Sequence, residues 1–155
     1  MNLLRRKFVK TAAFVGATVA VGSAALLPQR AIGAYAKAAF EAKDVDAALN
    51  ASLGSASHSP SGDIKLKAPD IAENGAVVPI TISTGMAGVS GISVIVSANA
   101  TPLTSTYVLS GDSEPFVSTR IKMAKTSDVL AVVKADGKLY STSKEVKVTI
   151  GGCGG

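Results

Sequence analysis

The chain has 155 residues, with 16 Lys and Arg against 11 Asp and Glu, and its formal net charge is +5. Such an excess suggests nucleic acid or a membrane surface as a partner. However, five of the basic residues precede Ala34 and all eleven acidic residues follow it, which leaves eleven of each from Ala34 onward. The body of the protein is therefore neutral, which argues against a nucleic-acid-binding surface there.

The chain contains one cysteine and one histidine. A single cysteine excludes an internal disulfide framework and every metal site built from several cysteines. A single histidine excludes a histidine cluster. We therefore expect neither a metal nor a cofactor.

Residues 1–34 follow the order of a bacterial export signal. A basic stretch that includes Arg5 and Arg6 precedes an uncharged run over residues 11–27, and small residues follow. The arginine pair, followed by Phe8 and Lys10, resembles the twin-arginine signal, whose translocation pore carries folded proteins. A general secretory signal is the alternative. The segment predicts a periplasmic protein.

The uncharged run of this leader is about 17 residues long and only moderately hydrophobic, which disfavours a permanent membrane anchor. We expect the leader to be cleaved, and three cleavage positions stay open: after Gly33, Ala34 or Ala36.

The remainder, about 121 residues, is enough for one domain and too short for two. Residues 35–62 predict an N-terminal helix and a loop. The composition over residues 35–53 is helical, Gly54 is a plausible stop, and the Ser- and Pro-rich residues 55–62 follow as the loop.

From residue 63 the hydrophobic period changes to two. Asp136-Gly137 predicts a hairpin turn, and Pro79 predicts that its strand lies at a sheet edge. We expect an all-β fold over residues 63–150, an immunoglobulin-like antiparallel sandwich. The β-branched runs that predict its strands are residues 64–66, 78–82, 92–97, 106–109, 117–123, 129–134 and 146–150.

The domain shows no recognisable catalytic motif. We interpret His58 as a solvated loop imidazole, and Asp112 and Glu114 as loop acids. Arg120 and Lys122 alternate with apolar residues, so we place them on the solvent face of a strand, with partner contact as the alternative. Two further residues match the glycosylation pattern, which is uninformative after a bacterial export signal: Asn50 and Asn99.

The sequence given ends in a glycine-rich segment around the only thiol, Cys153. Glycine is the most costly residue to order, so we expect residues 151–155 to form a flexible arm rather than a packed element. Three residues extend at most about 10–11 Å, which is enough to lift the sulfur clear of the sandwich. The glycines of this arm are Gly151, Gly152, Gly154 and Gly155.

The arm offers the thiol no activating neighbour, and a free cysteine is only slightly ionised near neutral pH. Cys153 is therefore predicted to hold a substrate while separate enzymes act on it, rather than to catalyse a reaction. The alternative is a non-catalytic exported sandwich that forms an intermolecular disulfide through Cys153.

The arm and two further segments resemble the SoxY family, the carrier subunit of the bacterial sulfur-oxidising system. The similar segments are residues 146–155 (VKVTIGGCGG), 71–79 (IAENGAVVP) and 119–126 (TRIKMAKT), and the twin-arginine leader adds to the resemblance. Residues 99–103 depart from it, because a second proline is expected directly after Asn99. The departure affects a loop only.

The resemblance implies a thiosulfate carrier that is not itself an enzyme. A c-type cytochrome partner would join thiosulfate oxidatively to Cys153, and a metal-dependent hydrolase would release the terminal sulfonate as sulfate, leaving a persulfide. Where a sulfur dehydrogenase is present, it would oxidise the remaining sulfur. The resemblance also implies a permanent heterodimer partner, SoxZ, bound to the sandwich.

Overall fold

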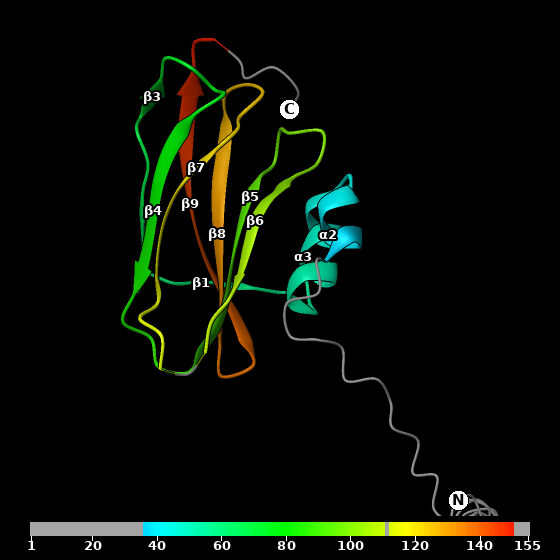
Figure 1. Ribbon diagram of the computed structural model, residues 1–155, viewed down its shortest axis with the longest axis vertical. Helices are drawn as coiled ribbons and strands as arrows, with labels where there is room; N and C mark the ends of the chain where they lie inside the picture. Colours follow the sequence, from blue (N-terminus) through cyan, green and yellow to red (C-terminus); the bar gives the residue numbers. More distant parts are fainter. Residues whose placement is uncertain (1–35, 111, 151–155) are drawn as a thin grey trace, which may run out of the picture. The chain divides into compact units, whose positions relative to one another are not determined.

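The structure is a computed structural model that describes residues 36–110 and 112–150 (Figure 1). The described part begins with two helices and continues with strands. The helices are α2 (Lys37–Glu41) and α3 (Val45–Leu53). The strands are β1 (Ser59–Pro60), β2 (Ile64–Lys67), β3 (Ile71–Ala72), β4 (Val78–Thr84), β5 (Val89–Val96), β6 (Leu103–Val108), β7 (Phe116–Ile121), β8 (Ser127–Ala135) and β9 (Lys138–Val148).

The helical segment predicted over residues 35–53 is confirmed, but the chain forms two helices there rather than one. Ala42 is extended, and Asp44 caps α3 by accepting a 2.7 Å hydrogen bond from the N–H of Ala47. An aspartate in this position stabilises a new helix start and so favours the break. Gly54 ends α3 as predicted, in the left-handed conformation with φ 87°.

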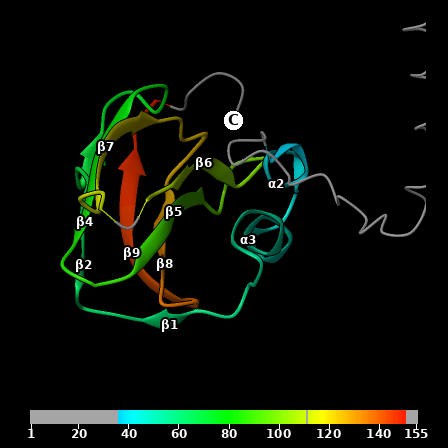
Figure 2. The same ribbon diagram turned by 60° about the horizontal axis from the view of Figure 1, so that its bottom comes forward.

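Two sheets pack face to face and confirm the predicted sandwich. The larger sheet has the order β1-β9-β8-β5-β6, with β3 also paired to β9, and the smaller has the order β2-β4-β7. The long strands pair in antiparallel fashion, whereas the two-residue strands β1 and β3 run parallel to β9. Figure 2 shows the helices on the outer face of the larger sheet, so three layers result.

Alternating side chains divide the core between these layers. Along β8, Val129, Ala131 and Val133 face the smaller sheet, while Val132 faces the helices. The cluster between the two sheets also includes Ile80, Ile82, Ile92, Val94 and Met123. The cluster between the larger sheet and the helices includes Leu49, Leu53, Ile95 and Leu103. Full burial of one such side chain contributes roughly 1.5–3 kcal/mol, more than an exposed ion pair, so the apolar clusters hold the fold.

The predicted hairpin is confirmed. Asp136 and Gly137 join β8 to β9 with φ values of 48° and 74°. Positive φ at both central residues is the requirement of a type I′ turn. The strand that follows begins earlier than predicted, because β9 starts at Lys138 and continues into the run predicted over residues 146–150.

The edge-strand prediction from Pro79 is wrong, because β4 lies in the centre of the smaller sheet. On one side of β4, the strand β2 pairs only with residues 81–84. On the other side, Arg120 of β7 is the residue paired with Pro79. Pro79 therefore lies beyond the end of β2 and has a strand neighbour on one side only. Proline has no N–H to donate to a neighbouring strand, and it is tolerated at a position where one side of the strand has no neighbour.

Candidate functional site

The candidate site is the end of the sandwich at which β9 finishes, at the top of Figure 1. The last described residue, Ile150, is 69% exposed there. The same end carries β3 and the loops of residues 73–77, 97–102 and 122–126, and we call this surface the tail end.

Hydrogen bonds fasten residues 148–150 to two neighbouring loops. The N–H of Gly75 donates to the carbonyl oxygen of Ile150 at 2.7 Å, and the carbonyl oxygen of Gly75 accepts from the N–H of Met123, also at 2.7 Å. The Thr149 hydroxyl donates to the carbonyl oxygen of Glu73 at 3.0 Å, and the N–H of Val148 donates to the Thr126 hydroxyl at 2.9 Å. Residues 148–150 thus have a defined position on the sandwich.

The Asn99 side chain joins two loops of the tail end. Its amide nitrogen donates to the carbonyl oxygen of Lys122 at 2.8 Å, and its amide oxygen accepts from the N–H of Ala124 at 2.9 Å. Asn99, which directly precedes the position where the family resemblance departs, therefore joins the loop of residues 97–102 to the loop of residues 122–126. Sequence reasoning assigned it no structural role, because the contact spans more than twenty residues of chain.

An ion pair secures the loop that precedes β3. The ammonium group of Lys144 lies 2.9 Å from Asp70 Oδ1 and donates to the carbonyl oxygen of Ala68 at 2.6 Å. The hydrogen bond from Lys144, followed by its positive charge, lowers the pKa of the Asp70 carboxyl. The same loop is hydrogen bonded to the end of β9, since the N–H of Lys147 donates to the carbonyl oxygen of Asp70 at 3.0 Å.

The basic residues near this end lie as predicted. Arg120 and Lys122 are exposed, and Ile121 and Met123, which alternate with them, are buried. Lys125 in the next loop is also exposed. The sequence did not single out Lys125, although its position in the segment over residues 119–126 placed it close to the other two.

Several predicted site residues lie outside the described residues. These are Cys153, the arm glycines Gly151, Gly152, Gly154 and Gly155, and the leader arginines Arg5 and Arg6. Their proposed roles stay predictions. The structure does describe the point from which the arm continues, three residues before Cys153.

The interpretation of His58 as a solvated loop imidazole is wrong. The ring is half-buried, and its Nδ1 atom forms a 2.8 Å hydrogen bond with the hydroxyl of the buried Ser141 on β9. This contact fixes the segment that carries β1 against the edge of the larger sheet. The prediction failed because Ser141 is 83 residues away in sequence.

The other acids singled out are loop residues, as predicted. Asp112 and Glu114 are both exposed between β6 and β7. Asn50 lies on α3 and is also exposed. None of these three residues belongs to the tail end.

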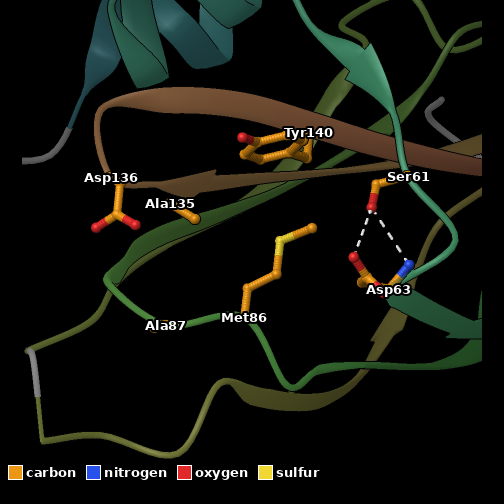
Figure 3. A pocket seen from close by; sticks show the side chains of 7 residues that line it. All are labelled: Ser61, Asp63, Met86, Ala87, Ala135, Asp136 and Tyr140. Atoms are coloured by element: carbon orange, nitrogen blue, oxygen red, sulfur yellow. Dashed lines mark hydrogen bonds between the residues drawn. The ribbon is translucent and has the colours of Figure 1, made fainter.

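A shallow depression of about 260 Å³ lies at the opposite end of the sandwich (Figure 3). Its two carboxylates, from Asp63 and Asp136, lie on different sides of Met86, and Asp63 is hydrogen bonded to Ser61. The pocket therefore does not pair two acids for catalysis.

Over residues 36–110 and 112–150 no group of three or more His, Cys, Asp or Glu is placed to hold a metal ion. No helix in that part of the chain is long and apolar enough to cross a membrane.

Comparisons with known proteins agree with this arrangement. A solved structure of the sulfur carrier protein SoxY from Chlorobium limicola f. thiosulfatophilum is 44% identical, with a TM-score of 0.63, over 69% of this chain and 97% of that one. A superoxide reductase (neelaredoxin) from Ignicoccus hospitalis is 19% identical over 59% of this chain and 80% of that one, with a TM-score of 0.49. No curated protein matches the chain.

The family comparison covers the tail end and the first three residues of the arm. The model of the family described as sulfur oxidation protein SoxY matches residues 49–153, a range that begins in α3 and ends at Cys153. This match includes most of the chain, and the Chlorobium protein is 44% identical over 69% of it. The chain therefore belongs to the SoxY family of sulfur oxidation proteins.

Proposed function

We propose that this protein is a periplasmic covalent carrier of sulfur-oxidation intermediates, with the substrate attached to the Cys153 thiol. The observation that carries the proposal is the exposed position of Ile150, fastened to the sandwich three residues before the only cysteine. The Cα atom of Cys153, three residues further along the chain, can lie at most about 10–11 Å from this defined point. Membership of the SoxY family supports the same role.

In the loading step, the Cys153 sulfur forms a bond with the outer sulfur of thiosulfate. The thiol proton leaves, and two electrons pass to a c-type cytochrome partner, which is the oxidant. The product is a cysteine S-thiosulfonate. Electrons do not need to reside on this chain, so the carrier itself requires no redox cofactor.

In the release step, water cleaves the bond between the outer sulfur and the sulfonate group. Sulfate and protons leave, and a persulfide remains on Cys153. A metal-dependent hydrolase is the catalyst of this step, so the carrier is not an enzyme. Where a sulfur dehydrogenase is present, it oxidises the persulfide sulfur for a second hydrolysis.

The leader and the family suggest where and with what partner this occurs. The arginine pair Arg5 and Arg6 suggests export through the twin-arginine route into the periplasm. A SoxZ-like subunit is the expected heterodimer partner. The leader is expected to be removed, so the exported carrier has no membrane anchor.

Intact mass of the protein purified from cells grown on thiosulfate tests the carrier function. We expect the intact protein to carry the added mass of a thiosulfonate group or of sulfur atoms, and we expect reduction to remove it. Mass analysis of the digested protein should place the addition on the peptide that contains Cys153. The alternative is an exported sandwich joined to a second copy through a Cys153 disulfide. A doubled mass that is halved on reduction, without sulfur adducts, would favour that alternative and contradict the carrier.

A further inference from the structure

We propose that the tail end is the docking surface for the enzymes that act on Cys153, and that those enzymes present a rim of apolar and acidic side chains around the active-site entrance. This inference rests on the proposed carrier function and names the surface that serves it. The surface is centred on Ile150 and includes Ile71, Val77, Lys122 and Lys125.

The length of the arm identifies the occupant of this surface. Cys153 is three residues from Ile150, so its Cα stays within about 10–11 Å of a residue fixed on the sandwich. An enzyme that brings catalytic groups to the sulfur must therefore place its entrance against the residues around Ile150. A partner bound at the opposite end of the sandwich would be out of reach.

Exposed apolar side chains gather where that entrance would lie. The described residues include five exposed large hydrophobic residues, and three of them belong to the tail end: Ile71 (59% exposed), Val77 (52%) and Ile150 (69%). Ile71 pairs with Lys147 on β9, and Val77 follows the turn whose Gly75 bonds to Ile150. Exposed apolar residues that lie near one another are typical of an interaction surface.

Positive charge lies beside this apolar group. Residues 119–126 carry Arg120, Lys122 and Lys125 and no acid, although the chain from Ala34 onward is neutral. Within the described part of the chain, none of these three cations takes part in a salt bridge. Unpaired cations around an apolar centre fit a partner with carboxylates at its rim, and they favour encounter at this end of the molecule.

Steady-state kinetics of thiosulfate-dependent cytochrome reduction test the docking surface. The assay uses the exported carrier in complex with its SoxZ-like subunit, together with the cytochrome and hydrolase partners. We expect Val77→Ser and Lys122→Glu each to raise the KM for the carrier about tenfold, with kcat changed less than about twofold. We also expect Lys122→Glu to weaken the dependence of kcat/KM on ionic strength. Alkylation of Cys153 by iodoacetamide is expected to proceed at the wild-type rate in both variants.

Two substitutions at the opposite end serve as matched controls. Phe116 begins β7, is 51% exposed and pairs opposite Ser83, whereas the other end of the same ladder joins Val78 to Ile121. Lys138 is exposed in the β8–β9 hairpin. Phe116→Ser makes the same change from apolar to polar as Val77→Ser, and Lys138→Glu makes the same charge reversal as Lys122→Glu. We expect both controls to leave the KM for the carrier unchanged.

The outcomes separate this inference from the carrier function. If KM is unchanged in Val77→Ser and Lys122→Glu while Cys153→Ser abolishes turnover, docking at the tail end is wrong and the carrier stands. An equal rise in KM for the controls would also overturn the docking surface. Slower alkylation in Lys122→Glu would show that Lys122 affects the reactivity of the Cys153 thiol, and it would contradict a role of Lys122 in binding a partner. Turnover retained in Cys153→Ser would instead overturn the carrier function.

Discussion

The backbone of Gly75 links the end of β9 to the loop after β7, because its N–H donates to Ile150 and its carbonyl oxygen accepts from Met123, both at 2.7 Å. Gly75 is buried, and both of its backbone polar groups are used. The position from which residues 151–155 continue is therefore determined by the backbone of the sandwich. A defined starting point is what the proposed carrier function requires of a short arm that presents its thiol to an enzyme.

Asn99→Ala is expected to destabilise the protein by about 1–3 kcal/mol, because it removes two hydrogen bonds and leaves the Lys122 carbonyl and the Ala124 N–H without their partner. Urea denaturation measures the loss. The matched control is Asn50→Ala on the exposed surface of α3, where a change within about 0.5 kcal/mol is expected. Equal losses in the two variants would show that Asn99 does not join the loops.

Asp70 is expected to make stability depend on pH at the acidic end. Its pKa in the folded protein is lowered by Lys144, so the contribution is present above the unfolded-state value of 3.8 and is lost as the pH falls through the lower folded value. Asp70→Asn should therefore lower the melting temperature near neutral pH and converge with wild type on strong acidification. Asp112→Asn, at an exposed loop carboxylate, is the control that should show no difference. A gap between Asp70→Asn and wild type that persists in strong acid would contradict this account.

Replacing Gly152 and Gly154 by proline is expected to reduce turnover with every partner enzyme by about tenfold or more. Proline fixes φ and thickens the arm, although the thiol is still present. Alkylation by small reagents should be normal, and alanine at the same two positions should cost less. Unchanged turnover in the proline variant would mean that the arm does not enter its partners.

Substituting Arg5→Lys together with Arg6→Lys is expected to keep both this chain and its SoxZ-like partner in the cytoplasm, still associated. The physical reason is that the twin-arginine pore carries folded cargo, so a partner without its own signal can be exported only in complex with this chain. Cell fractionation with an antibody to each subunit measures the result. A partner found in the periplasm while this chain is retained would refute joint export and leave the carrier role intact.

Local signals in the sequence were enough to predict most of the fold. Alternation of apolar residues gave the long strands, Asp136-Gly137 gave the hairpin, and Gly54 gave the end of α3. Each of these features depends on residues a few positions apart. The alternation of Arg120 and Lys122 with buried neighbours was predictable for the same reason.

Features that depend on distant residues could not be predicted. The pairing of His58 with Ser141 and the bridging role of Asn99 require knowledge of which loops meet. The tolerance of Pro79 in a central strand depends on where β2 ends. The segments over residues 71–79 and 119–126 contributed to the family resemblance, but only the structure shows that they meet through Gly75 and Met123, next to Ile150.

The effect of Cys153→Ser on thiosulfate-dependent electron transfer, measured beside its melting temperature, tests the central claim most directly. Because the thiol is expected to lie outside the packed core, the change in stability should stay within about 0.5 kcal/mol. Electron transfer in the reconstituted system should vanish. A variant that folds normally and retains more than a few per cent of wild-type turnover would contradict the claim that Cys153 carries the substrate.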